Sequence, residues 1–219
     1  MKFLCLDFEG VLIPEIWQYV AKETNSEELM LTTQDLKDYD DLMALRMKVV
    51  NEKNIKLSDI QEIVRSMEPF EGAKEFLKWA KQHFQVSIIS DTFYELCWPL
   101  VEKLNYPNII CHHLKIKDDK IVDYSLRHNK KKVIEALLNL NFGVLAAGDS
   151  YNDIDMLQTA DKGIFFQAPN HIKEEFPDLL TADNHEELKA HLLEYIKMSK
   201  NFFSVVKNSR PLKIVGTIN

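Results

Sequence analysis

The chain has 219 residues, of which 46% are hydrophobic, and a formal net charge of -7 at pH 7. A chain of this length can bury one core, or one core and a small accessory domain. The acidic balance argues against a nucleic-acid partner, because no excess of Lys and Arg is present to neutralise phosphates. No stretch approaches the roughly 20 apolar residues that cross a membrane, so we expect a soluble, cytoplasmic protein without a membrane partner.

The three cysteines, Cys5, Cys97 and Cys111, lie in apolar segments and lack C-x-x-C spacing. This usage favours reduced, buried thiols over disulfide bonds. The three tryptophans lie in apolar helical patterns, so we expect them in the core: Trp17, Trp79 and Trp98.

The first predicted elements are a short apolar strand and a long helical segment. Residues 3–6 form the apolar run, which stops at Asp7 and Glu9. The segment 14–68 shows repeated helical spacing and no convincing strand. Within this segment, Ser58 has the character of a helix N-cap, with Gln61 three residues further on. Strand 3–6 is therefore followed by a helical insertion, which the turn at 69–72 ends.

The remaining predicted elements alternate between helix and strand. In chain order they are a helix at 73–80, a strand at 86–89, a helix at 133–138, strands at 144–147 and 163–166, and a closing helix at 188–196. The pattern predicts an α/β fold, a doubly wound and mostly parallel sheet with a small helical cap inserted after the first strand.

The predicted domains are a catalytic core at 1–13 and 69–198, a helical cap at 14–68, and a C-terminal tail at 199–219. The structure of the tail is left open. Its two apolar pairs, Phe202-Phe203 and Val205-Val206, are compatible with docking or with disorder.

Polar side chains end three of the predicted strands. Asp7 and Glu9 follow the first, 90–92 (Ser-Asp-Thr) the second, and Asp149 and Asp153 the third. The carboxyl ends of parallel strands share one edge of a sheet, where such folds place their chemistry. So many carboxylates repel without a cation, and hard oxygen ligands in an open site favour Mg²⁺. With hydroxyls, helix N–H groups and a lysine to hold phosphate, the set predicts phosphoryl transfer through an aspartyl-phosphate.

The lysines at 130–131 and the histidines at 112–113 each allow two interpretations. The apolar stripe of helix 133–138 continues back to Lys130, which favours Lys130 as the phosphate-binding lysine, with Lys131 as the alternative. His112 and His113 point to opposite faces of an extended segment and lack further ligands at metal-binding spacing. We interpret both histidines as structural.

Four motifs, in order and spread over about 150 residues, carry a family resemblance. They are Asp7-x-Glu9-Gly10-Val11, Ser90-Asp91-Thr92, a lysine upstream of the third strand, and Gly148-Asp149-x-x-Asn152-Asp153. They resemble the motifs of the haloacid-dehalogenase phosphatase superfamily. The residues around these motifs are most similar to those of the phosphoserine phosphatase branch, and within it to those of the bifunctional phosphoserine phosphatase/homoserine phosphotransferases. The resemblance covers roughly residues 1–195.

The resemblance implies a role for each matching residue. Asp7 would be the nucleophile and Glu9 the general acid and base. Mg²⁺ would be held by Asp7, by the Glu9 carbonyl and by Asp149, with Asp153 bonding a coordinated water. The residues implied to bind substrate are Ser90, Asp91, Lys130 and Asn152 around the phosphate, Glu15 for an ammonium group and Arg46 for a carboxylate.

Glu9 departs from the aspartate that is usual in the superfamily. The extra methylene shifts the proton by about an ångström, which predicts slower hydrolysis or a preference for another acceptor. The predicted function is that of a Mg²⁺-dependent phosphoserine phosphatase of serine biosynthesis, which also transfers the phosphoryl group to homoserine. Two alternative functions stay open: a phosphatase for another small metabolite, and a catalytically silent ligand-binding domain. The oligomeric state also stays open, with a homodimer as one possibility.

Overall fold

The computed structural model describes residues 2–32, 35–36 and 38–208, with side chains described to residue 198. Within these residues a seven-stranded sheet has the order β4-β3-β2-β1-β5-β6-β7. Its strands are β1 (Lys2–Leu6), β2 (Gln85–Phe93), β3 (Asn108–Lys117), β4 (Lys120–Ser125), β5 (Gly143–Gly148), β6 (Lys162–Phe166) and β7 (Leu180–Ala182). All neighbouring strands pair in parallel except β3 with β4. The doubly wound α/β fold is confirmed.

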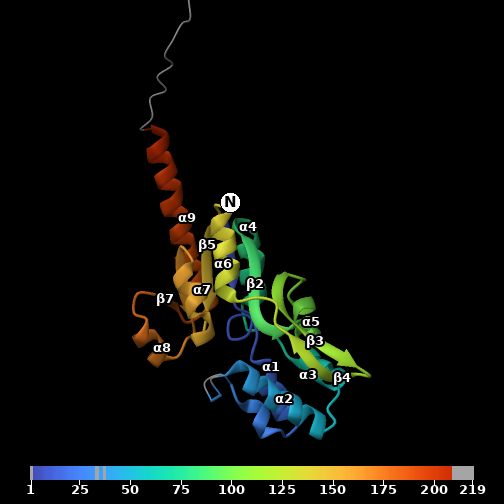
Figure 1. Cartoon of the computed structure of the whole chain (residues 1–219). Helices are drawn as coiled ribbons and strands as arrows, with labels where there is room; N and C mark the ends of the chain where they lie inside the picture. Colours follow the sequence, from blue (N-terminus) through green and yellow to red (C-terminus); the bar gives the residue numbers. More distant parts are fainter. Residues whose placement is uncertain (1, 33–34, 37, 209–219) are drawn as a thin grey trace, which may run out of the picture.

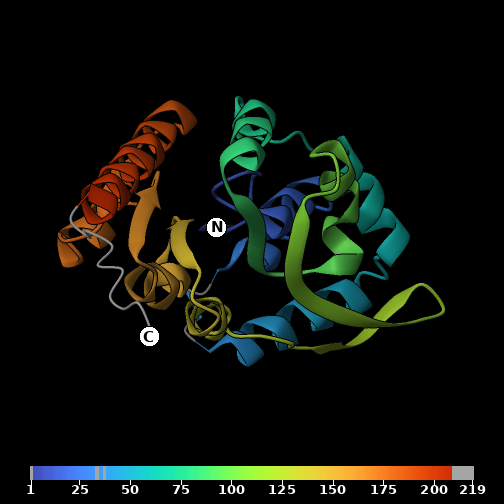
Figure 2. The ribbon, with the colours of Figure 1, turned by 90° about the horizontal axis from the view of Figure 1, so that it is seen from above.

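Helices cover both faces of the sheet. They are α1 (Ile16–Glu23), η1 (Glu27–Met30), α2 (Tyr39–Glu52), α3 (Leu57–Ser66), α4 (Ala73–His83), α5 (Tyr94–Lys103), α6 (Lys130–Asn139), η2 (Tyr151–Asp153), α7 (Ile154–Thr159), α8 (Asn170–Glu175) and α9 (His185–Asn208). Successive residues of β1 face opposite ways, so Leu4 joins the core under α4, α5 and α9, whereas Cys5 joins the core under α6, α7 and α8. The sheet therefore lies between two layers of helices (Figures 1 and 2).

The central strand β1 has β2 on one side and β5 on the other. The chain leaves β1 toward one half of the sheet and returns to the other half through β5. Such a reversal opens a crevice at the carboxyl ends of the strands, where open α/β sheets bind ligands. The fold thus fixes the place of a site before any side chain is considered.

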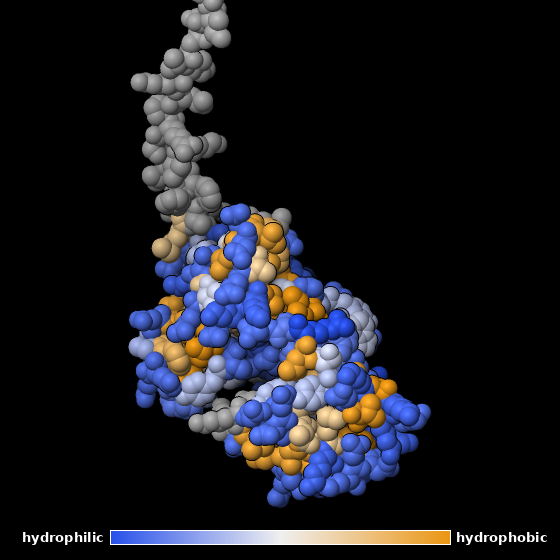
Figure 3. Space-filling view, viewed as in Figure 1, coloured by the Kyte–Doolittle hydropathy of each residue, from blue (hydrophilic) through white to orange (hydrophobic). Residues whose placement is uncertain are grey.

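The helices between β1 and α4, which we call the inserted helices (α1, η1, α2 and α3), gather at the carboxyl-end side of the sheet (Figure 1). The β3–β4 hairpin fastens them there. At its turn, the backbone N–H of Leu57 donates to the carbonyl of Asp119 over 2.9 Å. The Ser58 hydroxyl donates to the Asp119 carboxylate over 2.6 Å. Figure 3 shows a hollow between the inserted helices and the rest of the molecule, with hydrophilic residues along much of its rim.

Two local expectations were wrong. Helix α3 begins at Leu57, one residue before the expected cap, because Ser58 bonds Asp119 of the hairpin instead of its own helix N-terminus. Trp98 is 42% exposed, since it lies on the outer face of α5. There it stacks on Tyr94 with ring centroids 5.5 Å apart.

The expectations for the other two tryptophans and for the cysteines hold. Trp17 is buried and Trp79 packs partly buried against the core. The three cysteines are buried and unpaired. Helix α9 continues to residue 208, whereas the apolar pairs of the predicted tail have no described side chains, and 209–219 lie outside the described residues. Among the described helices, none is both long and apolar enough to cross a bilayer.

Candidate active site

The carboxyl ends of β1, β2 and β5 bring the predicted residues into one cavity of about 490 Å³. β1 pairs with β2 and with β5, and the Asp7 N–H donates to the Ala147 carbonyl over 2.9 Å just beyond the last β1–β5 pair. All predicted site residues except Asp153 line this cavity: Asp7, Glu9, Glu15, Arg46, Ser90, Asp91, Lys130, Asp149 and Asn152. Asp153 is fully buried beside it. The proposed roles of these residues stay predictions, but their convergence is a fact of the fold.

Lys130 is the cation at the centre of this carboxylate cluster. Its side chain is 3% exposed, and its Nζ lies 2.8 Å from Asp7 and 2.7 Å from Asp153. Asp91 is 3.6 Å away. Burial lowers the pKa of Lys130, but these carboxylates outweigh burial and hold the pKa well above its usual value. Lys131 does not line the cavity, so Lys130 is the lysine that the helix phase predicts at this place.

Two glycines make room for the carboxylates. Gly10 has a φ of +74°, and a Cβ there would lie 2.3 Å from the Asp149 carboxyl carbon. A Cβ at Gly148 would lie 2.4 Å from the Asp153 carboxyl carbon. Asp153 accepts hydrogen bonds from the backbone N–H groups of Asp149, over 3.0 Å, and Ser150. Any larger residue at either glycine displaces an acidic group.

The acidic groups fit a divalent cation. One oxygen from each of Asp7, Asp149 and Asp153 lies within 4.8 Å of the others. Burial, followed by the charge of Asp153, raises the pKa of Asp149 to about 7. The same two causes, in the same order, raise the pKa of Asp7 well above its usual value. Close carboxylate oxygens that resist ionisation together are a donor set for Mg²⁺. The Glu9 carboxylate accepts from the Ile16 N–H over 3.1 Å, so its side chain is engaged outside this set.

Glu15 and Arg46 line the same cavity. Arg46 donates from Nη2 to the Leu31 carbonyl over 3.1 Å, and its guanidinium lies 5.0 Å from the centre of the Trp17 ring. Its Nε is buried without a partner among the described residues. Burial lowers the pKa of Arg46, while Glu9 opposes this shift. Burial, followed by the charge of Glu9, raises the pKa of Glu15 to about 9.

The chemistry of these two side chains suits charged groups of a ligand. An unpartnered N–H of a buried guanidinium suits a carboxylate, and a buried carboxyl crowded by another acid suits a cation. Together they match a small ligand that bears a carboxylate and a cationic group.

A family model described as haloacid dehalogenase-like hydrolase matches residues 7–158. The chain belongs to this family. Among proteins of known name, it is 44% identical over 208 residues to phosphoserine phosphatase ThrH of Pseudomonas aeruginosa, covering 94% of this chain and 100% of that protein. It is 26% identical to a phosphoserine phosphatase of Methanocaldococcus jannaschii, covering 90% and 98%.

Solved structures agree in fold with this haloacid dehalogenase-like hydrolase. An apo phosphoserine phosphatase superposes with a TM-score of 0.71 at 23% identity, covering 89% of this chain and 98% of the other. A phospho-aspartyl intermediate analogue of phosphoserine phosphatase superposes with a TM-score of 0.64 at 21% identity, over 89% and 98%. The resemblance that the motifs indicate is thereby confirmed.

Polar side chains surround Asp91, and one of them, Tyr39, was not singled out by the sequence. Tyr39 of α2 donates from its hydroxyl to the Asp91 carbonyl over 3.0 Å. Asn152 donates to the Asp91 carboxylate over 3.0 Å. His112, interpreted as structural, lies 3.4 Å from the same carboxylate. Although burial raises the pKa of Asp91, the nearby Lys130 and its polar neighbours outweigh burial and hold the pKa well below the usual value.

Magnesium is expected to raise the melting temperature of this hydrolase more at pH 8 than at pH 5.5. Because the pKa of Asp149 is raised to about 7, the stability linked to its protonated form is lost as the pH rises through that value. At pH 8 bound Mg²⁺ relieves the repulsion between the carboxylates of Asp7, Asp149 and Asp153. At pH 5.5 protons compete with Mg²⁺ for the same carboxylate oxygens. We expect the two increments to differ by about 5 °C.

Thermal unfolding in EDTA and in excess Mg²⁺, at both pH values, measures these increments. Asp149→Asn serves as the matched control, since it removes the titrating group, and should shrink the difference. An equal increment at pH 5.5 and pH 8 in the parent protein would contradict the metal site.

Proposed function

We propose that the chain is a Mg²⁺-dependent phosphoserine phosphatase that works through a phosphorylated Asp7. One observation carries the proposal: a single cavity is lined by Asp7, which pairs with Lys130, and by Arg46, whose buried Nε has no partner among the described residues, beside the crowded carboxyl of Glu15. Phosphoserine offers a phosphate, a carboxylate and an ammonium group to these positions. The relatives named phosphoserine phosphatase support the same substrate.

We propose that the inserted helices act as a cap domain, residues 14–68, on a core of 1–13 and 69–198. The cap carries Glu15 and Arg46, whereas the core carries the acidic cluster. This division assigns substrate recognition to the cap and phosphoryl chemistry to the core.

In the first step, an Asp7 oxygen bonds phosphorus and the seryl oxygen leaves with a proton from Glu9. The Asp7 carboxylate is oriented by the Phe8 N–H, which donates to it over 2.7 Å, and by Lys130. In the second step, Glu9 takes a proton from water, the water oxygen bonds phosphorus, and the bond to Asp7 breaks. Asp7, Asp149 and the Glu9 carbonyl would hold Mg²⁺, with Asp153 in support, and the ion supplies neutralisation of phosphate charge.

Arg46→Lys should lower kcat/KM for phosphoserine at least tenfold and change that for an aryl phosphate less than threefold. Lysine keeps the charge but loses the planar fork that pairs with a carboxylate, and the aryl phosphate has no carboxylate. Steady-state kinetics on both substrates test this. Arg65→Lys, on the exposed face of α3, is the matched control. Equal losses on both substrates would show that Arg46 does not recognise the substrate carboxylate. Glu15→Gln tests recognition of the ammonium group by the same comparison of substrates.

We propose further that the phosphoryl group passes from Asp7 to homoserine as well as to water. Homoserine offers the same ammonium and carboxylate, with its hydroxyl one methylene further out. One methylene is worth only about 1–3 kcal/mol in a binding site, and the longer arm of Glu9 suits an alcohol in that place.

Phosphoserine, Mg²⁺ and excess homoserine should therefore yield phosphohomoserine beside inorganic phosphate in phosphorus NMR. Inorganic phosphate alone at saturating homoserine would leave a phosphatase and refute the transfer. Glu9→Asp should move the partition toward hydrolysis, and an unchanged ratio would exclude Glu9 as the cause.

A further inference from the structure

The end of β2 is irregular where it enters the site. Ile89 pairs with Ile110 of β3, and the next pair along the strands joins Phe93 to His112, so the register shifts across 90–92. Three residues of β2 thus stand opposite one residue of β3. A bulge of this kind turns side chains out of the sheet and leaves backbone groups without ladder partners. The residues in the bulge are Ser90, Asp91 and Thr92, the second of the four motifs.

Side chains from elsewhere satisfy the carbonyls of the bulge. His128 approaches the Ser90 carbonyl with Nε2 at 3.0 Å. A carbonyl oxygen only accepts, so the proton of this imidazole lies on Nε2. His128 Nδ1 is then an acceptor, and it is buried without a partner among the described residues. Burial lowers the pKa of His128, which agrees with a neutral ring. The next carbonyl, that of Asp91, is taken by the Tyr39 hydroxyl.

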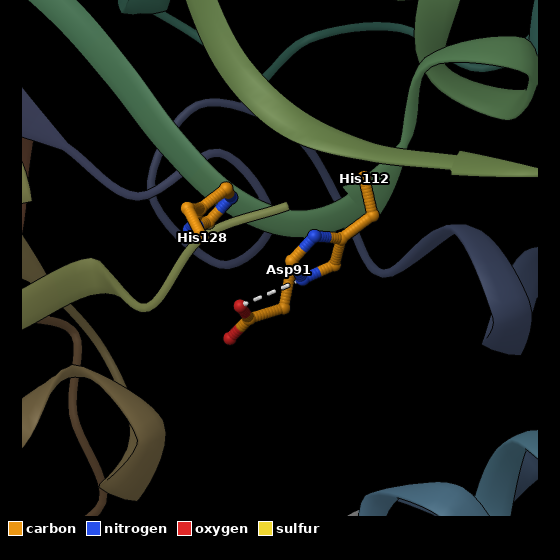
Figure 4. A group of neighbouring side chains, drawn as sticks. All are labelled: Asp91, His112 and His128. Carbon is orange, nitrogen blue, oxygen red and sulfur yellow. Dashed lines mark ion pairs between the residues drawn. The ribbon is translucent and has the colours of Figure 1, made fainter. Parts of the chain in front are cut away.

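His112 contacts the side chain of Asp91 in the bulge. The backbone N–H of Arg127 donates to His112 Nδ1 over 3.1 Å, so a neutral His112 carries its proton on Nε2. Nε2 lies 3.4 Å from the Asp91 carboxylate, toward which this proton points (Figure 4). The rings of His112 and His128 stack with centroids 4.5 Å apart and planes at 23°. Each histidine therefore stiffens the other while it contacts one of two consecutive motif residues.

The same three side chains have the proximity of a metal site, since ligand atoms of Asp91, His112 and His128 lie within 4.8 Å of one another. Ligation through Nε2 of His112 needs the lone pair on that atom, which moves the proton to Nδ1. There it would oppose the N–H of Arg127, which already points at Nδ1. The hydrogen bonds of His112 thus favour a donor to Asp91 over a metal ligand.

We propose that His112 and His128 are positioning residues, which hold the β2 bulge so that Ser90 and Asp91 keep their places around the substrate phosphate. This inference rests on the proposed function for the part played by Ser90 and Asp91. It makes the phosphate-binding end of β2 depend on two side chains that do not line the catalytic cavity.

The test compares glutamine and asparagine at both histidines. A glutamine amide N–H lies near the place of His Nε2 and keeps a donor there, whereas asparagine is too short. We expect His112→Asn and His128→Asn to raise the inhibition constant of inorganic phosphate about tenfold, and the two Gln variants to stay within threefold of the parent. The constant is measured with an aryl phosphate substrate. The Mg²⁺ activation constant should stay within twofold throughout.

His113→Asn is the matched control. His113 is the neighbour of His112 on the opposite face of β3, where it contacts Glu95, so its loss should leave the phosphate constant unchanged. Tyr39→Phe removes one donor to the bulge without changing the shape of the ring, and should raise the constant by a smaller factor. If the asparagine variant of one histidine fails to fold, the Asn and Gln variants of the other still decide the inference.

Three results would overturn the inference. They are parent-like phosphate constants in the Asn variants, equal weakening by Asn and Gln, and stoichiometric zinc binding by the parent that His112→Gln abolishes. A parent enzyme that cleaves the aryl phosphate but not phosphoserine would refute the proposed substrate alone, because the phosphate constants of the variants would still decide the role of the histidines.

Discussion

Asp7→Asn is expected to lower kcat by at least a thousandfold while the fold persists. An amide is nearly isosteric with the carboxylate but is a poor nucleophile and a poor metal ligand. The carboxylate is buried among like charges that raise its pKa, so its neutral replacement also removes a repulsion. We therefore expect the melting temperature of the metal-free variant to stay within a few degrees of the parent. Release of phosphate from an aryl phosphate gives the rate, and thermal unfolding gives the stability.

Asp178→Asn, at an exposed position, is the control and should keep parental activity. Beryllium fluoride should inhibit the parent in the presence of Mg²⁺ by imitating a phosphorylated Asp7. An Asp7→Asn variant with activity within tenfold of the parent would rule out the covalent mechanism, and so would a parent that beryllium fluoride leaves untouched.

Lys130→Met should cost about 3–5 kcal/mol of unfolding free energy in the absence of metal, and at least a hundredfold in kcat. Methionine fills a similar volume but leaves the buried Asp7 and Asp153 carboxylates without their shared cation. Mg²⁺ should restore part of the stability, because it brings positive charge to the same oxygens. Urea unfolding in EDTA and in excess Mg²⁺ gives both quantities.

Lys131→Met provides a control on the adjacent side chain. Lys131 lines an adjoining cavity and makes none of these ion pairs, so its loss should change stability by less than about 0.5 kcal/mol. A larger effect from Lys131→Met than from Lys130→Met would return the assignment to the alternative lysine.

The strands next to the centre of the sheet could be predicted, and its edges could not. β1, β5 and β6 are continuous apolar runs because both of their faces are covered by helices. β3 carries two histidines and two lysines, and its outer half has a single neighbour, β4. β7 has three residues. Edge and solvated strands gain their structure from pairing rather than from their own pattern, so neither was apparent in the sequence.

The same distinction applies to the site. The acidic residues were predicted because strand ends must meet at one edge, and Lys130 because helical phase extends its apolar stripe. Glu15 and Arg46 were predicted as site residues only through the family resemblance. His128 gave no signal, since it lies in a connection and bonds a carbonyl 38 positions away. Contacts of that kind depend on the finished fold.

The position of β1 has a consequence for the order of folding. This strand precedes the other strands of the sheet in the sequence, yet Phe3 pairs with Gln85 on one side and with Val144 on the other. The inserted helices can form through contacts between residues close in sequence. The central strand pairs with residues more than 80 and 140 positions away, so its pairing requires much longer loops to close. Loop closure adds only about 0.6 kcal/mol for each doubling of length, so the stability of the sheet is little affected. The rate is affected more, because distant pairing slows folding, and Asp7 takes its place only when the slowest contacts have formed.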